Sequence, residues 1–173
     1  MTLDAEFEAL FHEYQRAITA YLTNLLGDEG RGQELAQETF LRAYRALARG
    51  VRVEHPKAWL YRIATNAAND QFRRARLVRW VPLLDRDDDP ALRTPGPAQG
   101  VANRLALQAA LARLAPGYRV PLLLHLSEGL STAEIGEVLG ISRAAVKVRL
   151  FRAREKCRAA LKEAGGVEWE GST

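Results

Sequence analysis

A pair of helix-start signals between residues 131 and 154 constrains the fold more than any other part of the chain. Ser131 precedes a run of apolar residues at helical spacing and is followed three residues later by Glu134, the spacing of a capping box. Ser142 can cap a second helix after a short break at Gly140, since glycine suits a left-handed helix terminus. Two helices joined by so short a turn predict a helix-turn-helix, in which the first turns of the second helix enter the major groove of DNA.

The charge of this second helix indicates the same kind of ligand. Between Ser142 and Lys162 there are eight basic residues and one acidic residue, Glu155. The whole chain has a formal net charge of +4, which favours a polyanionic partner without naming it. A solvated basic surface is the plainer explanation of such a helix, but here capping signals, a turn and basic residues coincide. We therefore predict that this segment binds nucleic acid.

Several classes of protein find no support in the sequence. The single cysteine, Cys157, excludes an internal disulfide and a cysteine-based zinc site, which favours the cytoplasm. The three histidines lie far apart, and neither a phosphate-binding Gly-rich loop nor a nucleophile motif is present. The longest apolar run, residues 120–126, is too short to span a bilayer. We expect a non-enzymatic protein without catalytic residues, cofactor, metal or membrane insertion.

Residues 3–50 have the apolar periodicity of two amphipathic helices. The Gly-rich segment 27–32 is predicted to separate them, so that the second helix begins near Gln33 and ends near Arg49. Its expected apolar side consists of Leu35, Phe40, Leu41, Tyr44 and Leu47. On the opposite face three polar residues are neighbours at helical spacing, Glu34, Gln37 and Glu38. These three form either a solvated surface or a patch for a basic partner.

A third helix is predicted to begin near Pro56, which suits a first helical turn. Basic and amide side chains recur along it as a polar stripe: Lys57, Arg62, Asn66, Asn69, Arg73 and Arg74. A soluble surface could look the same. Interleaved with aromatic residues, however, such groups are suited to contacts with phosphates and bases.

The segment from Pro82 to about Asn103 differs in composition, because it contains four prolines and an acidic cluster at 85–89. No helical or strand periodicity continues through it, so we predict a linker. The alternative is an acidic segment that becomes ordered along a basic channel of a partner. Helix resumes after it, Pro116 is expected to stop that helix, and a short helix from Tyr118 to Ser127 should follow. The core of that short helix is expected to consist of Leu122, Leu123, Leu124 and Leu126. The predicted fold is all-α, with helical domains at 1–80 and 104–164, a Pro/Asp-rich linker at 81–103 and a tail at 165–173.

Three blocks of sequence, in this order, carry a resemblance to a known family. Residues 33–44 (QELAQETFLRAY) and 58–66 (AWLYRIATN) resemble the promoter −10 domain of an extracytoplasmic-function (ECF) sigma factor. Residues 109–161 resemble the −35 domain of the same family. The resemblance implies a dissociable subunit of bacterial RNA polymerase that directs the enzyme to promoters and helps to melt them. It also implies an anti-sigma factor as a further partner.

The resemblance assigns roles to residues of this chain. Its implied contacts with the clamp helices of the polymerase core are made by Glu34, Gln37, Glu38 and Tyr44. The −10 element would be bound single-stranded, with a flipped base near residues 48–55, by Lys57, Arg62, Asn66, Asn69, Arg73, Arg74 and Arg76. The −35 element would be bound double-stranded by Ser142, Arg143, Ala144, Lys147, Val148, Phe151 and Arg152. The resemblance also implies contact with the flap region of the core, and the linker would thread toward the active-site cleft and the RNA exit channel.

One departure from the family concerns Val148, where the family commonly has a small polar residue. An apolar contact to a thymine methyl would replace a hydrogen bond there. Two other classes of protein share the C-terminal motif: a LuxR-like transcriptional regulator and a DNA recombinase. A regulator would need no polymerase-binding patch in residues 33–44, and a recombinase would need a nucleophilic Ser or Tyr in an N-terminal catalytic fold.

Overall fold

The computed structural model describes residues 2–78 and 99–164, except for the side chains of 76–78 and 99–104. Within these ranges every regular element is a helix, which confirms the all-α prediction. The N-terminal domain has three helices: α1 (Leu3–Leu26), α2 (Glu29–Ala48) and α3 (Pro56–Val78). The C-terminal domain has four: α4 (Gln99–Ala112), α5 (Pro116–Leu126), α6 (Thr132–Leu139) and α7 (Arg143–Glu163). The predicted linker lies mostly outside the described residues, although α4 already begins at Gln99.

The helix starts in the C-terminal domain are those predicted from the sequence. The Ser131 hydroxyl accepts a hydrogen bond from the Glu134 backbone N–H, and the Glu134 carboxylate accepts one from the Ser131 N–H. Gly140 ends α6 in the left-handed conformation at φ 65°, and the Ser142 hydroxyl caps α7. The helix-turn-helix is therefore formed by α6 and α7.

The predicted start of α2 at Gln33 is wrong, because the helix already begins at Glu29. The Asp28 carboxylate accepts a hydrogen bond from the Arg31 N–H at 3.0 Å and caps the helix there. Gly32 is a site of close packing and not a break: a Cβ on it would lie 2.3 Å from Thr23 Oγ1 and 2.7 Å from Thr23 Cα. The glycine lets the first turn of α2 cross directly over α1.

Three further expectations are corrected by the tertiary structure. Pro116 does not stop a helix but stands in the first turn of α5, where its missing N–H has no helical partner to lose. Leu126, predicted to lie in the core, is 50% exposed, and Leu41 on α2 is 48% exposed. Both leucines lie at helical positions that turn away from the neighbouring helices, which apolar periodicity alone does not reveal.

The N-terminal domain packs α1 and α3 around buried aromatic and small residues. The hydroxyls of Tyr21 and Thr65 are hydrogen-bonded at 2.9 Å, and the Tyr21 ring meets the Tyr61 ring edge-on at a centroid distance of 5.3 Å. On the buried side of α3 the small residues Ala64 and Ala68 are fully buried, so neighbouring helices approach closely. This packing fixes which face of α3 remains available to a ligand.

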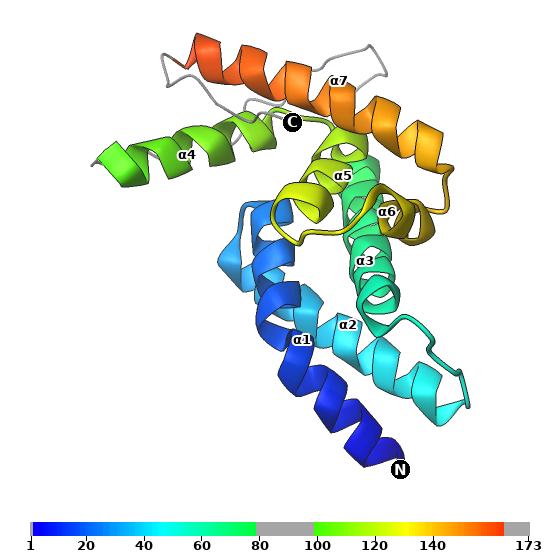
Figure 1. Ribbon diagram of the computed structural model, residues 1–173. Coiled ribbons are helices and arrows are strands. Elements are labelled where there is room, and N and C mark those ends of the chain that lie inside the picture. Colours follow the sequence, from blue (N-terminus) through cyan, green and yellow to red (C-terminus); the bar gives the residue numbers. More distant parts are fainter. Residues whose placement is uncertain (1, 79–98, 165–173) are drawn as a thin grey trace.

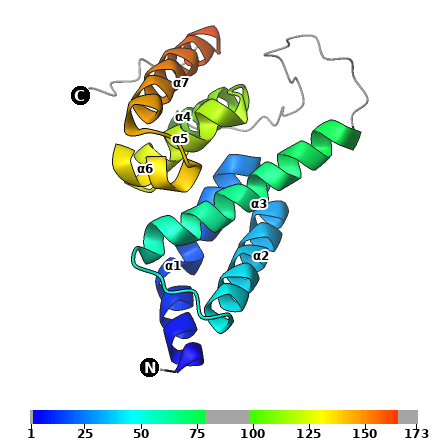
Figure 2. The ribbon, with the colours of Figure 1, turned by 90° about the vertical axis from the view of Figure 1, so that its right-hand side faces the viewer.

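The two domains lie against each other, which the sequence did not predict. α6 packs on α3, and α5 packs on α1. Figure 2 shows α6 over the N-terminal half of α3, and Figure 1 shows α7 running across the far side of the C-terminal domain. The buried apolar residues of both domains form one continuous cluster. We call this arrangement the closed form.

Candidate nucleic-acid interface

The acidic patch predicted on α2 is exposed. Glu34, Gln37 and Glu38 all face solvent, one helical turn apart, so their polar groups can be offered together to a partner. Leu41 continues the same face as an exposed apolar residue. This patch therefore combines acidic groups with an apolar side chain.

Tyr44 is placed differently from the other residues assigned to this patch. Its ring packs edge-on against Phe7 at 5.1 Å, and its hydroxyl donates a hydrogen bond to Asp4 at 3.3 Å. Tyr44 therefore joins α2 to the first turns of α1. Its polar end is directed to the N-terminal helix of this chain.

The polar stripe on α3 is formed by Arg62, Asn66, Asn69 and Arg73, which occupy positions i, i+4, i+7 and i+11 and are all exposed. This spacing places them along one face of the helix, opposite the buried alanines. Arg74 is exposed toward α2, where it lines a small cavity of about 130 Å³. Arg76 belongs to α3, but its side chain lies outside the described residues.

A chain of ion pairs connects the α2 patch to the α3 stripe. Arg42 pairs with Glu38 on its own helix and approaches Asp70 of α3 at 3.7 Å, and Asp70 also accepts a hydrogen bond from Arg73 at 2.5 Å. Sequence reasoning missed Asp70, although its position three residues before Arg73 is a signal for a helical ion pair. Because these groups are partly exposed, each pair contributes little to stability. Their effect is to orient the arginines.

The residues assigned to the −35 element are all exposed on α7 or at its start: Ser142, Arg143, Ala144, Lys147, Val148, Phe151 and Arg152. Buried Val146 and Leu150 anchor the opposite side of the helix. The two large apolar members of the set stand out, since Val148 is 49% exposed and Phe151 is 66% exposed. An apolar side chain held in solvent beside basic groups suits contact with thymine methyls and sugar atoms in a groove.

Lys57, at the start of α3, is engaged across the domain boundary. Its Nζ donates a hydrogen bond to the backbone carbonyl of Glu128 at 2.8 Å, and one turn later the Tyr61 hydroxyl donates to the Glu128 carboxylate. Glu128 lies in the segment between α5 and α6. Neither Tyr61 nor Glu128 was singled out from the sequence, because nothing local connects them.

The electrostatics of Glu128 reflect its position between the domains. Burial raises the pKa of its carboxyl group, while the hydrogen bond from Tyr61 and the positive charge of Lys57 lower it, and burial has the larger effect. Burial also raises the pKa of Tyr61, so the phenol is a neutral donor. A second tie is made by Arg119 of α5, whose guanidinium donates to the Leu25 carbonyl of α1 at 2.9 Å.

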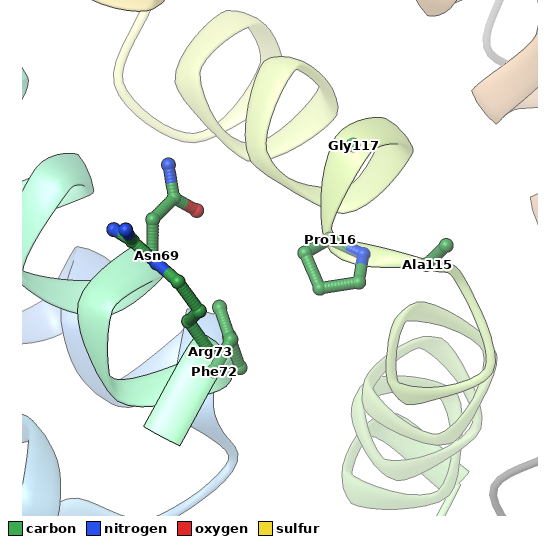
Figure 3. A pocket seen from close by; sticks show the side chains of 6 residues that line it. All are labelled: Asn69, Phe72, Arg73, Ala115, Pro116 and Gly117. Carbon is green, nitrogen blue, oxygen red and sulfur yellow. The ribbon is translucent and has the colours of Figure 1, made fainter. Parts of the chain in front are cut away.

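A cavity of about 370 Å³ opens between the domains further along α3. It is lined by Asn69, Phe72 and Arg73 on one side and by residues 115–117 on the other. Figure 3 shows Asn69, Phe72 and Arg73 on α3 across the cavity from Pro116 at the start of α5. Part of the polar stripe therefore borders the C-terminal domain in the closed form.

Among the described residues there is no cluster of three or more potential metal ligands. In the same part of the chain, no helix combines the length and apolarity that crossing a membrane requires. Cys157 is buried, and burial raises the pKa of its thiol.

Comparison with known families gives matches over both domains. Residues 10–78 match the family model described as Sigma-70 region 2, and residues 104–157 match Sigma-70, region 4. The chain is 33% identical over 162 residues to the ECF RNA polymerase sigma factor SigL of Mycobacterium tuberculosis, covering 93% of this chain and 92% of that protein. It is 32% identical to the RNA polymerase sigma factor CarQ of Myxococcus xanthus, covering 91% and 90%.

Two solved structures are similar over nearly the whole chain. The sigma factor RpoE in complex with the anti-sigma factor NepR from Bartonella quintana aligns with a TM-score of 0.70 at 24% identity, covering 91% of this chain and 97% of that one. CnrH in complex with the cytosolic domain of CnrY aligns with a TM-score of 0.65 at 27% identity, covering 92% and 90%.

Proposed function

This chain belongs to the ECF sigma factors of bacterial RNA polymerase, and we propose that its three exposed polar surfaces divide the work of that family among α2, α3 and α7. As a sigma factor it binds the polymerase core, recognises promoter DNA and promotes initiation. The surface on α2 would bind the core, that on α3 the −10 element, and that on α7 the −35 element.

The observation that carries this division is the distribution of charge among the three helices. The α2 surface offers Glu34 and Glu38, whereas the α3 stripe and the α7 face are basic. Acidic side chains suit a basic protein surface and would be repelled by DNA. Basic and amide side chains suit phosphates and base edges.

The two DNA surfaces differ in a way that fits their proposed ligands. On α7 the exposed residues form a continuous face at the start of a helix-turn-helix recognition helix, which suits the major groove of double-stranded DNA. On α3 two arginines, Arg62 and Arg73, flank two asparagines, Asn66 and Asn69, whose amide groups can hydrogen-bond to the edges of unpaired bases. The loop before α3 exposes Val51 and contains Gly50 at φ 84°, and we propose that it borders the pocket for the flipped base.

Two further aspects follow from membership of the family. Because the solved relatives are complexes with the anti-sigma factor NepR and with the cytosolic domain of CnrY, we propose an anti-sigma partner for this chain as well. Sigma factors are transcription initiation factors, so we propose that the chain acts by binding, without catalysis of its own. Its polymerase and DNA ligands imply a cytoplasmic location.

The alternative of a LuxR-like regulator is not supported, since residues 10–78 match Sigma-70 region 2. In a regulator this half of the chain would sense a signal. The same match occupies the segment in which a recombinase would carry its catalytic fold.

The test is in vitro transcription with bacterial core polymerase on a library of genomic DNA, with the start sites mapped. We expect transcripts only when the protein is added, from promoters that share −10 and −35 sequences. A chain that binds DNA but yields no promoter-specific transcripts with core polymerase would contradict the proposal. The charge-reversed α2 variant described in the Discussion is the matched negative control.

A further inference from the structure

Two hydrogen-bond donors on α3 converge on a single acidic residue of the other domain. Lys57 and Tyr61 lie one helical turn apart, so their side chains project from the same face. Both donate to Glu128, Lys57 to its carbonyl oxygen at 2.8 Å and Tyr61 to its carboxylate. Sites that bind a DNA phosphate also commonly combine a cationic donor with a neutral donor.

Glu134, at the start of α6, also lies near this boundary. Its pKa is lowered chiefly by hydrogen bonds with Ser131, and further by the nearby side chains of Lys57 and His55. The beginning of α3 therefore offers the positive charge of Lys57 beside the hydroxyl of Tyr61, and Glu128 of the C-terminal domain accepts hydrogen bonds from both. This is where the proposed −10 strand would leave the flipped-base loop and enter the α3 stripe.

The closed form cannot engage both promoter elements at once. Elements centred at −10 and −35 are separated by about 25 base pairs, which is about 85 Å of duplex at about 3.4 Å per base pair. A compact chain of 173 residues has a radius of gyration of about 16 Å. The domains must therefore separate for two-part promoter binding, and their separation removes Glu128 from Lys57 and Tyr61.

We propose that Lys57 and Tyr61 form a subsite for a backbone phosphate of the −10 strand, and that Glu128 occupies this subsite in place of the phosphate when the domains are closed. Closure and −10 binding are then mutually exclusive, because they use the same two donors. The proposal rests on the proposed function of α3 as the −10 surface. It assigns roles to Tyr61 and Glu128 that their positions in the sequence do not suggest.

The balance of forces on Glu128 suits a displaceable occupant. Burial raises the pKa of its carboxyl group despite the favourable effects of Tyr61 and Lys57. When Glu128 leaves the subsite, its carboxylate is hydrated again, so the desolvation cost of the closed form is recovered. A phosphate that takes its place does not require a segment of this chain to be buried with it. We call this contact of Glu128 with Lys57 and Tyr61 the latch. It keeps the domains together in the free protein and breaks when polymerase and DNA hold the domains apart.

The experiment measures binding of a fluorescein-labelled single-stranded oligothymidine to the full-length chain by fluorescence anisotropy over a range of salt concentrations. Glu128→Ala removes the carboxylate to which Tyr61 donates, while the backbone carbonyl to which Lys57 donates remains, and the variant is expected to bind several-fold more tightly than the wild type. Its matched control is Glu137→Ala, which removes one negative charge from an exposed position on α6. Small-angle scattering should show a larger radius of gyration for Glu128→Ala than for Glu137→Ala.

The subsite itself is tested in both backgrounds. In the Glu128→Ala protein, Lys57→Ala should weaken binding and reduce the salt slope by about 0.7, the value for one phosphate contact with a single strand. Tyr61→Phe should weaken binding without changing the slope, since it removes a neutral donor. In the closed wild-type background both substitutions should have much smaller effects, which makes the coupling measurable as a double-mutant cycle.

The outcomes separate this inference from the proposed function. Equal affinities of Glu128→Ala and Glu137→Ala, or an effect of Lys57→Ala that is the same in both backgrounds, would overturn the latch. Glu128→Gln, which keeps the size of the side chain, is expected to fall between wild type and Glu128→Ala and provides a second measurement should the alanine variant unfold. If all variants still direct polymerase to promoters while these differences are missing, only the latch fails; if the wild type directs no initiation, the proposed function fails.

Discussion

The hydroxyl of Tyr61 donates a hydrogen bond to the carboxylate of Glu128, joining α3 of the N-terminal domain to the segment between α5 and α6. Lys57 and Arg119 likewise tie the domains together through polar groups. Interfaces between domains that separate are typically more polar than permanent ones. The contact thus has the polar character that is typical of domains able to separate.

Charge reversal of the α2 patch tests the polymerase interface. Glu34→Lys combined with Glu38→Lys should abolish binding to core polymerase in a pull-down, because a basic partner surface would then be repelled. Folding should be retained, since both residues are exposed and the Glu38–Arg42 pair contributes no more than about 1 kcal/mol. Glu8→Lys with Glu13→Lys, on the exposed side of α1, changes the net charge equally and should still bind. Unchanged affinity of the α2 variant would remove the patch from the polymerase interface.

Substitution on α7 tests the −35 interface. Lys147→Ala and Arg152→Ala should each weaken binding to a −35 duplex by about 1–3 kcal/mol if the side chain contacts a base, and specificity should relax at one position. A side chain that contacts only phosphate would instead weaken all sequences equally and lower the salt slope by about 1. Lys162→Ala, at the far end of the same helix, is the control. Footprints and salt slopes identical to wild type for both variants would show that this face does not meet DNA.

Gly32 tests the crossing of α1 and α2. Gly32→Ala should lower the free energy of unfolding by about 1–3 kcal/mol, because the added Cβ meets the backbone of Thr23, which cannot move independently of its helix. Gly30→Ala, two residues earlier, meets only the Asp28 side chain at 3.4 Å, and should be neutral or stabilising by up to about 1 kcal/mol. Urea denaturation of the two variants measures the difference. A Gly32→Ala protein as stable as Gly30→Ala would mean that the helices can separate at this point without loss.

The capping box of α6 predicts a dependence of stability on pH. Hydrogen bonds from Ser131 lower the pKa of Glu134, so its ionised form stabilises the fold; this contribution is complete above the ordinary pKa of a glutamate and is lost as the pH falls through the lowered value. Ser131→Ala should lower the free energy of unfolding by about 1 kcal/mol near neutral pH. Thermal melts between about pH 7 and about pH 3 should show a smaller acid-induced loss in Glu134→Gln than in wild type.

In the same thermal melts, the contribution of Glu128 to stability should change with pH in the opposite direction to that of Glu134. Its pKa is raised in the closed form, so its contribution to stability increases as the pH falls through the raised value toward the ordinary pKa of a glutamate. Glu128→Gln removes the gain of stability that comes from protonating Glu128. The variant should therefore lose more stability than the wild type when the pH is lowered. An identical pH profile for Glu128→Gln and wild type would show that Glu128 is not buried between the domains in solution.

Features that depend on residues close together along the chain could be predicted from the sequence. The capping pair Ser131 and Glu134, the cap at Ser142 and the left-handed terminus at Gly140 could be predicted because helix termini are satisfied by side chains within a turn. The residues of the exposed face of α7 were implied by the family resemblance. The functional roles of these residues came from the family resemblance, because helical periodicity does not assign a function to a residue.

Other features were decided only by packing between distant segments. Gly32 looked like a helix breaker because its contact is with Thr23 of another helix, and Leu41 and Leu126 looked like core residues because periodicity does not state which face has a neighbour. The meeting of Asp70 with Arg42 and of Tyr61 with Glu128 joins residues far apart in the chain. Such contacts depend on how whole helices and domains are placed, since burial is a property of the assembled core and not of any local stretch.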